Sequence, residues 1–164
     1  MAENNKSARG DGGLYATFLL GEAAFGVAAE QVQEVVRPGS ITPVHHAPPF
    51  VLGIRNLRGK IVTVIDLAVR LDLGCAQVGT DSRVLIVDWQ GEPVGLLVDS
   101  VADTIAIDGE RIEAPPANVH GVQARHLRGI YRGTERLVAV LDLGAVLQPE
   151  TGAGTAEGQV ARVS

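Results

Sequence analysis

Short apolar runs separated by polar or glycine-containing turns follow one another along most of the chain. Runs rich in Val, Ile and Leu occur at 14–20, 61–65, 83–87, 94–98 and 137–141. Such runs, bounded by turn residues, are typical of strands, so a mainly β protein with a few short helices is predicted. Within 28–36, the spacing of Val32, Val35 and Val36 predicts a short helix, which Pro38-Gly39 ends.

Two aspartates mark the ends of apolar runs, and the two chain ends have a different composition. Asp66 and Asp142 each follow a strand-like run and precede a leucine, which predicts that each caps a short helical turn. The stretches 1–13 and 148–164 contain mostly small and polar residues. With little to bury, they are predicted to be a disordered N-terminal arm and a disordered C-terminal tail.

The sequence contains an internal duplication. Segments 53–71 and 129–147 align without a gap, with identical residues at seven of nineteen positions, and 18–36 matches 87–105 in pattern. The alternative is a chance likeness between Val-rich strands, but turn, strand, Asp-Leu and helix recur in one order. Closing the strands of such a small unit into a barrel removes exposed edges. We therefore predict two intertwined β-barrel lobes with a groove between them, in one domain over 14–147, from repeat units of about 18–71 and 87–147.

One feature is not duplicated. Arg55, Arg58 and Lys60 form a basic turn, whereas Arg132-Gly133-Thr134-Glu135 stands in the place of 56–59. Arg58 is either a solvated side chain or a contact for an acidic partner surface, since arginine binds carboxylates with two parallel hydrogen bonds. Val32 and Glu34 are likewise either ordinary core and surface or an apolar contact beside a polar rim.

Composition narrows the function classes. A net charge of -5 argues against nucleic acid as the main partner, because phosphate binding needs a basic face. The single cysteine, Cys75, excludes an intramolecular disulfide and fits a reducing cytoplasm. No run approaches the length of a membrane span, and the N-terminus lacks the apolar core of a signal peptide. A cytoplasmic protein without direct membrane insertion is predicted.

The histidines are the main candidates for chemistry. His45 and His46 are adjacent in an extended segment, so their side chains point to opposite sides and do not favour one shared metal ion. His120 and His126 have no neighbouring nucleophile and acid. We predict no catalytic residues, no metal and no cofactor. A small hydrolytic or metal-dependent enzyme built on these four histidines is the weaker alternative.

Several motifs together resemble the CheW family of chemotaxis coupling proteins. They include Phe-Gly-Val at 25–27, Asn-Leu-Arg-Gly at 56–59, Val-Ile-Asp-Leu at 64–67 and Gly-Leu-Leu-Val-Asp at 95–99. The resemblance implies two SH3-like five-stranded β-barrels. It also implies a non-catalytic scaffold that joins the cytoplasmic tip of a chemoreceptor to the regulatory domain of a CheA-type histidine kinase, recruited to membrane-bound receptor arrays. Other CheW-like proteins are further expected partners in rings.

The resemblance also assigns residues. The receptor-binding candidates that it implies are Val32, Glu34, Asn56, Leu57 and Arg58. The candidate kinase or ring contacts are Ile112, Glu113 and Asn118. Thr63 and His45-His46 depart from the family's usual residues. They leave open a second interpretation, a paralogous scaffold in a chemosensory pathway that does not control motility.

Overall fold

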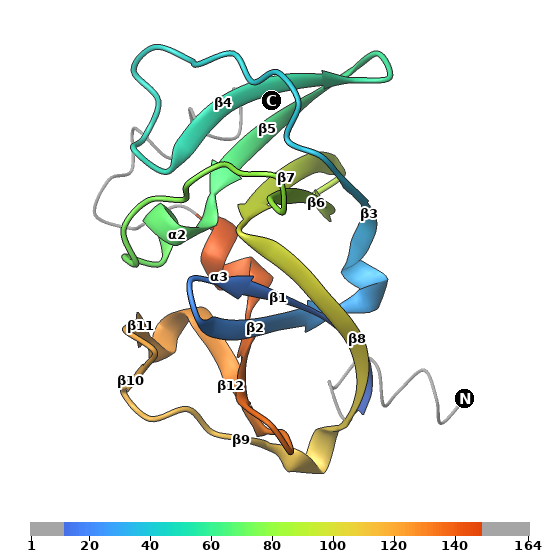
Figure 1. Ribbon diagram of the computed structural model, residues 1–164, viewed down its shortest axis with the longest axis vertical. Coiled ribbons are helices and arrows are strands. Elements are labelled where there is room, and N and C mark those ends of the chain that lie inside the picture. The colour runs from blue at the N-terminus through green and yellow to red at the C-terminus, as the bar shows by residue number, and fades with distance from the viewer. Residues whose placement is uncertain (1–11, 149–164) are drawn as a thin grey trace.

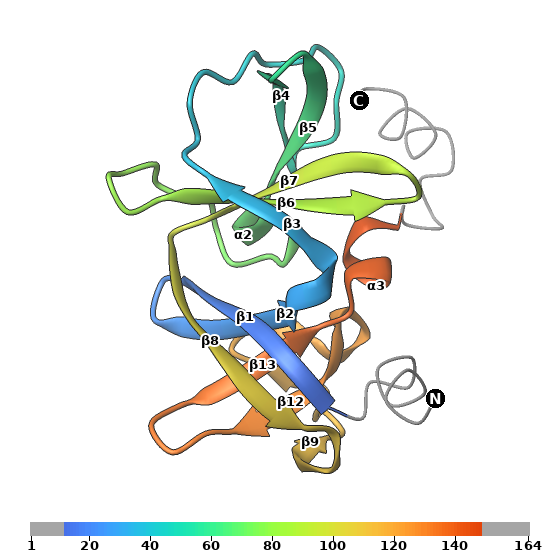
Figure 2. The same ribbon diagram turned by 90° about the vertical axis from the view of Figure 1, so that its right-hand side faces the viewer.

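The strands of the protein form two sheets and one small hairpin (Figures 1 and 2). The computed structural model describes residues 12–148. The first sheet has the order β8-β1-β2-β13-β12-β9 and the second has the order β3-β6-β7-β5-β4. The mainly β fold predicted from the sequence is confirmed. The predicted arm and tail lie outside the described residues, except that Gly12 and Gly13 belong to β1 and Gln148 follows the last helix.

The elements of each sheet come from both halves of the chain. The first sheet comprises β1 (Gly12–Leu20), β2 (Ala23–Ala28), β8 (Ser100–Asp108), β9 (Ile112–Glu113), β12 (Leu127–Arg132) and β13 (Leu137–Leu141). The second comprises β3 (Val32–Val36), β4 (Val51–Leu57), β5 (Lys60–Asp66), β6 (Arg83–Trp89) and β7 (Glu92–Val98). The hairpin is β10 (Asn118–Val119) with β11 (Val122–Gln123). The helices are α2 (Leu67–Arg70), α3 (Leu143–Leu147) and the 3-10 turns η1 (Ala29–Gln31), η2 (Gly109–Arg111) and η3 (Ala124–His126).

The duplication in the sequence is visible in the pairing of the strands. The five strands β8-β1-β2-β13-β12 of the first sheet have the same order as their repeat equivalents β3-β6-β7-β5-β4, and β9 is an additional edge strand of the first sheet. The parallel registers also match, because Val140 lies opposite Gly26 and Val64 lies opposite Gly95. The third strand of each repeat, β3 or β8, joins the sheet that holds the first two strands of the other repeat. The two lobes are therefore intertwined.

The helix predicted over 28–36 is wrong beyond its first turn. Only η1 is helical, and β3 pairs with β6. A register shift between Val32 and Glu34 leaves Val32 opposite Val87 and Val35 opposite Leu85. Because a bulge inserts one extra residue, side chains three positions apart face the same way. The bulge imitates the i, i+3 spacing of a helix, which is why the pattern is misleading.

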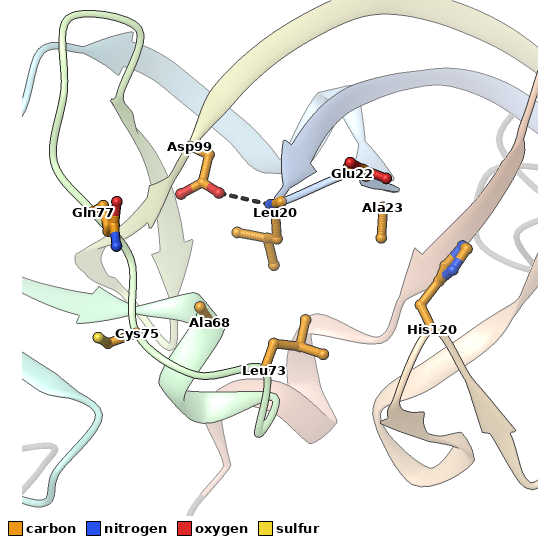
Figure 3. A pocket seen from close by; sticks show the side chains of 10 residues that line it. Leu20, Glu22, Ala23, Ala68, Leu73, Cys75, Gln77, Asp99 and His120 are labelled. Atoms are coloured by element: carbon orange, nitrogen blue, oxygen red, sulfur yellow. Dashed lines mark hydrogen bonds between the residues drawn. The ribbon is translucent and has the colours of Figure 1, made fainter.

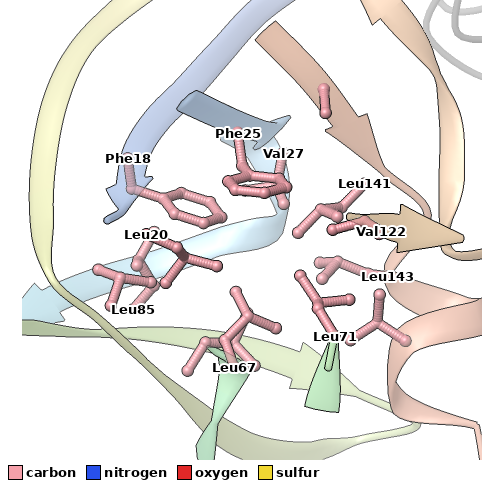
Figure 4. Close-up of a cluster of buried hydrophobic side chains, with 14 of the residues drawn as sticks. Phe18, Leu20, Phe25, Val27, Leu67, Leu71, Leu85, Val122, Leu141 and Leu143 are labelled. Carbon is pink, nitrogen blue, oxygen red and sulfur yellow. The ribbon is translucent and has the colours of Figure 1, made fainter. Parts of the chain in front are cut away.

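The largest hydrophobic cluster lies between the two sheets (Figure 4). Phe18 and Phe25 enter it from the first sheet, and Leu85 and Leu96 enter it from the second. A smaller cluster, which includes Val62, lies on the other face of the second sheet, and one around Tyr15 lies on the other face of the first. Each sheet is therefore covered on both faces, and the shared cluster fixes one lobe against the other.

The two edges of the second sheet are tied together. The segment after β3 forms a bridge to β4, with the Thr42 and Ile54 backbones exchanging two hydrogen bonds of 2.8 Å. Gly53 permits this approach, because a Cβ there would lie 2.2 Å from the Thr42 carbonyl oxygen. At the duplicated Gly129 a Cβ would lie 2.5 Å from the Glu113 carbonyl oxygen. These ties agree with closed barrels; the SH3-like description stays a prediction.

The two short helices begin as the sequence predicts. The Asp66 Oδ1 accepts hydrogen bonds from the backbone N–H groups of Ala68, at 3.1 Å, and Val69, at 3.3 Å. The Asp142 Oδ1 accepts one from Ala145 at 3.1 Å. Both aspartates are thus N-caps, which satisfy backbone donors that a helix leaves without intrahelical partners.

A buried arginine joins these helices. Arg70 of α2 is 7% exposed, and its Nε donates to the Val146 carbonyl at 2.6 Å. Its Nη2 lies 3.2 Å from the Gln148 carbonyl and 3.5 Å from the Ala145 carbonyl. The guanidinium also lies over the Phe50 ring, 5.1 Å from its centroid. One side chain from the first repeat therefore caps the last helix of the second repeat.

Thr63 provides a stability prediction. It is 2% exposed, and its hydroxyl has no hydrogen-bond partner among the described residues. The duplicated position is the buried Ala139 of the shared cluster. Because an unpaired buried hydroxyl is costly, Thr63→Val is expected to raise the free energy of unfolding by about 1 kcal/mol. Urea unfolding measures this, with Thr17→Val as the control: Thr17 is 5% exposed but donates to the Asp103 carbonyl, so its replacement is expected to destabilise.

Candidate functional site

The non-duplicated basic turn is the tip of the β4–β5 hairpin. Leu57 pairs with Lys60, so Arg58 and Gly59 form a two-residue loop. Their φ angles are 52° and 87°, as a type I′ turn requires. The Asn56 Oδ1 accepts a hydrogen bond from the Gly59 N–H at 3.0 Å and holds the loop closed. The local sequence thus dictates a tight turn with Arg58 at its exposed tip.

The same turn occurs at two other hairpins. Between β6 and β7, the Asp88 side chain accepts from the Gly91 N–H at 2.9 Å. Between β10 and β11, the Asn118 side chain accepts from the Gly121 N–H at 3.0 Å. An Asn or Asp three residues before a glycine is therefore a turn-forming device of this chain. Asn56 has a structural explanation that does not depend on a partner, whereas Arg58 does not.

This explanation predicts a modest, non-specific effect of Asn56→Ala. Loss of one side-chain-to-backbone hydrogen bond is expected to lower the free energy of unfolding by about 1 kcal/mol. Asn118→Ala is the matched variant, because its side chain has the same role in the β10–β11 hairpin. Chemical denaturation of both proteins measures the effect. A much larger loss for Asn56→Ala than for Asn118→Ala would contradict a shared turn-forming role.

Arg58 and Glu34 form an ion pair at the rim of the second sheet. β3 and β4 are opposite edges of that sheet, so the pair closes the sheet at the hairpin tip. The two side chains remain 66% and 34% exposed. Arg55, the other arginine of the turn, instead donates to the carbonyl oxygen of Arg37, the residue after β3. Arg58 is therefore the arginine of this turn that projects to the surface beside a carboxylate.

The five predicted receptor residues do not form one continuous patch. Glu34, Asn56 and Arg58 meet at the hairpin tip. Leu57 is half-buried and packs against the smaller cluster that includes Val62, on the face of the second sheet that is turned away from the first. Val32 is also half-buried and packs on the shared cluster between the sheets. The structure thus divides the set into three parts: a polar rim of Glu34, Asn56 and Arg58, the half-buried Leu57, and Val32 on a different face of β3.

Three exposed apolar side chains extend the face that carries Val32. They are Leu14 on β1, Val35 on β3 and Val101 on β8, which are 59%, 44% and 38% exposed. Val35 and Val101 lie opposite Leu85 and Phe18 of the shared cluster. Figure 2 shows β1, β3 and β8 on the same face of the molecule. We call Leu14, Val32, Val35 and Val101 the apolar strip.

Sequence reasoning missed most of this strip, although the sequence contains two signals. Val101 is the repeat equivalent of Val32, and Val35 belongs to the valine spacing that wrongly predicts a helix. The bulge in β3 is what places Val32 and Val35 on one face. Leu14 has no signal in the sequence, since a strand-like apolar run does not reveal which side chain stays exposed.

Of the predicted ring contacts, Ile112 and Glu113 lie on β9 at the edge of the first sheet, and Asn118 lies on β10 of the separate hairpin. Ile112 is partly buried and packs against the cluster around Tyr15. Glu113 is exposed and lies 3.2 Å from the Arg132 Nε, in an ion pair between β9 and β12. Asn118 closes the β10–β11 turn. Of these three, Glu113 is the residue with its functional group directed outward on a sheet edge.

The histidines lie in separate environments. The His45 and His46 ring centroids are 6.4 Å apart. The His120 ring packs edge-on against the Phe25 ring, with 6.0 Å between the two ring centroids, and His126 is buried. Within residues 12–148, no group of three His, Cys, Asp or Glu side chains has the arrangement to hold a metal ion. No helix in that range is both long and apolar enough to span a membrane.

The protein is thus a duplicated β domain of two sheets. Its candidate site is a charged rim at the hairpin tip together with the apolar strip. The model of the CheW-like domain family matches residues 14–150, and the chain belongs to this family. It is 31% identical to the chemotaxis protein CheW of Treponema pallidum over 77% of each chain. It is 30% identical to the protein FrzA of Myxococcus xanthus, over 80% of this chain and 82% of FrzA.

A solved structure supports the same conclusion. The scaffolding protein TtCheW from Thermoanaerobacter tengcongensis superposes with a TM-score of 0.78 and 36% sequence identity. The match covers 85% of this chain and 89% of that protein. The family resemblance and the mainly β fold expected from the sequence are thus confirmed.

Proposed function

We propose that this protein is a non-catalytic scaffold that couples chemoreceptors to a CheA-type histidine kinase in chemotaxis signalling. The observation that carries the proposal is the CheW-like match over 14–150, combined with an Asn-Leu-Arg-Gly hairpin that occurs in one repeat only. A scaffold needs binding surfaces and no reactive group.

The receptor side is proposed to be the apolar strip together with the Arg58–Glu34 rim. The resemblance to the CheW family implies a receptor tip that is a helical hairpin, and a helix binds by laying its apolar face against an apolar surface. Leu14, Val35 and Val101 offer that surface, because each keeps more than a third of its area exposed. The rim then supplies charged groups that fix orientation and exclude wrong partners.

The ring side is proposed to lie at the β9 edge of the first sheet. Ile112, Glu113 and Asn118 fall on β9 and the neighbouring β10–β11 hairpin. A sheet edge leaves backbone N–H and C=O groups that pair readily with another chain. The kinase regulatory domain, and other CheW-like proteins, are the proposed partners there. The protein is cytoplasmic in this proposal and reaches the membrane only through its receptors.

A second candidate function has a specific observation in its favour. FrzA of Myxococcus xanthus has the same family relationship to this chain as the proteins named for chemotaxis, with a similar identity. A relative of similar identity thus carries a name other than CheW, and the second candidate is a paralogous scaffold in a chemosensory pathway that does not control motility. The two candidates share both partner classes and differ only in which receptors are bound.

Direct binding tests the proposal. The purified full chain is immobilised and exposed separately to a CheA-type kinase and to a soluble receptor-tip fragment from the same organism. Saturable binding of both at micromolar concentrations is the expected result. Failure of the chain to bind either partner would overturn the proposal. If receptors of only one pathway bind, they identify which of the two candidate pathways the protein serves.

A further inference from the structure

Positive charges of the second lobe gather at one end of the molecule. Residues 35–65 include four lysine and arginine side chains and no aspartate or glutamate, although the whole chain has a net charge of -5. The four are Arg37, Arg55, Arg58 and Lys60, and all except the half-buried Arg55 are exposed. Figure 1 shows β4, β5 and the loop that follows β3 together at one end of the long axis. We call these four side chains the basic end.

Contacts within the chain hold the basic end in place. The Arg55 guanidinium donates to the Arg37 carbonyl oxygen and thus joins β4 to the residue after β3. It also lies against Gly39, where a Cβ would be 2.9 Å from the Arg55 Cζ, so glycine at this position leaves room for the guanidinium. Lys60 pairs with Leu57 directly beside the tight turn. Side chains that are already positioned lose less conformational freedom when they bind a partner.

One carboxylate at the basic end offsets only part of its charge. Glu34 forms an ion pair with Arg58. Among the described residues, Arg37, Arg55 and Lys60 have no ion-pair partner. Four positive charges and one negative charge therefore meet there, and three of the cations lack a carboxylate within the described part of the chain.

We propose that the basic end is a docking site for a carboxylate-rich segment of a partner protein, in addition to the receptor and kinase contacts proposed above. Arginine binds carboxylates with two parallel hydrogen bonds, and lysine adds a compact positive charge. The cations come from the residue after β3, from β4 and from the hairpin tip, so they are spread over several elements. An extended acidic segment can reach all of them, whereas one compact anion cannot.

The charge of the rest of the chain favours a narrow partner over a broad anionic surface. Outside residues 35–65 the carboxylates are in excess. Figure 3 shows two of them, Glu22 and Asp99, lining a cavity for which the described residues supply no lysine or arginine. Like charges repel over a Debye length of about 8 Å at physiological ionic strength. A membrane or a nucleic acid would meet these carboxylates as well, whereas a single acidic segment meets the basic end alone.

The probe is a blocked hexaglutamate peptide, titrated at low salt into the isotope-labelled full chain and followed by backbone amide NMR. Saturable shifts are expected at Arg37, Gly59 and Lys60, and added salt is expected to weaken them. A blocked hexaglutamine peptide, which has the same length and no charge, is expected to leave these resonances in place. Absence of saturation with the glutamate peptide, or equal shifts with both peptides, would overturn the proposal.

Two double variants with the same loss of charge locate the site. Arg37→Gln with Lys60→Gln is expected to weaken binding of the glutamate peptide about tenfold, because two exposed ion pairs are lost. Arg128→Gln with Arg136→Gln removes two exposed arginines of the first lobe, and a change within about twofold is expected. Circular dichroism checks that both variants fold. Equal weakening by the two variants would show that only the net charge of the chain matters and would contradict a site at the basic end.

Sedimentation with vesicles of phosphatidylglycerol and phosphatidylcholine is the third arm. The chain is expected to stay in the supernatant. Sedimentation with these vesicles, without saturable binding of the glutamate peptide, would assign the basic end to a membrane surface and overturn the proposal. Arg58 is left unchanged in both double variants, and no arm uses a receptor or a kinase. Failure here is therefore distinguishable from failure of the proposed coupling role.

Discussion

Replacing Arg70 with leucine is expected to lower the free energy of unfolding by about 3 kcal/mol, because buried carbonyl groups lose their donors. The Arg70 guanidinium donates to carbonyls at the end of α3, and Leu lacks any donor for them. The contact between the guanidinium and the Phe50 ring is lost as well. Urea unfolding followed by circular dichroism measures the difference.

The control for this variant is Arg128→Leu, at an exposed position of β12. It makes the same chemical change without removing a buried donor, so a change within about 0.5 kcal/mol is expected. A similar small effect at Arg70 would mean that the link between α2 and α3 does not hold the lobes together. Arg70→Lys is expected to fall between wild type and Arg70→Leu, since a single ammonium does not reproduce the spread of guanidinium donors.

Replacing Arg58 with glutamate is expected to weaken binding of the receptor tip by roughly thirtyfold, about 2 kcal/mol, while the kinase binds nearly as before. The substitution reverses the charge at the hairpin tip and places it beside Glu34. Because the ion pair is largely exposed, its direct contribution to stability is about 1 kcal/mol or less. Titration calorimetry with each partner, beside a denaturation curve, separates the two effects.

A charge-swap variant distinguishes a contact from a structural role. Arg58→Glu combined with Glu34→Arg restores an ion pair across the rim but reverses the sign of each position. If the pair only closes the sheet, the double variant recovers receptor binding. We expect it to recover stability and not affinity. Equal loss of receptor and kinase binding in the single variant would show that the hairpin tip has no specific role.

Much of the fold was predictable because the duplication constrained it. Identical residues such as Gly53 and Gly129 recur because a neighbouring carbonyl approaches both positions closely, and Asp66 and Asp142 recur because both cap helices. Local sequence therefore encoded turns, caps and strands twice. Intertwined lobes were predicted, but the local sequence does not identify β3 and β8 as the exchanged strands, because the exchange depends on long-range pairing.

The candidate site was predictable only in part, for a physical reason. A tight turn has a local signature, so the hairpin with Arg58 is recognisable from the sequence. Which side of β3 faces outward depends on one bulge, which moves Val35 to the face that carries Val32. Exposure of Leu14 and Val101 depends on how the two lobes pack. The local sequence can thus show that these positions are apolar, but it does not show which of them stay exposed.

The four residues of the turn at 56–59 have different roles in the structure. Asn56 and Gly59 form the same side-chain-to-backbone hydrogen bond that Asp88 and Asn118 form with glycines in two other hairpins. This bond explains the shape of the hairpin. Its leucine, Leu57, packs against the smaller hydrophobic cluster that includes Val62. Arg58 is the residue of the four that neither builds the turn nor packs in the interior. The proposed receptor contact is therefore best tested at this residue.

The most direct test of the proposed coupling role is whether the protein connects its two partners. Membrane vesicles carrying the receptor are mixed with the kinase, with and without the full chain, and sedimented. The proposal predicts that the kinase sediments with the vesicles when the wild-type chain is present, and that Arg58→Glu largely abolishes this recruitment. Equal sedimentation of the kinase in the absence of the chain, or none in its presence, would contradict the proposed role.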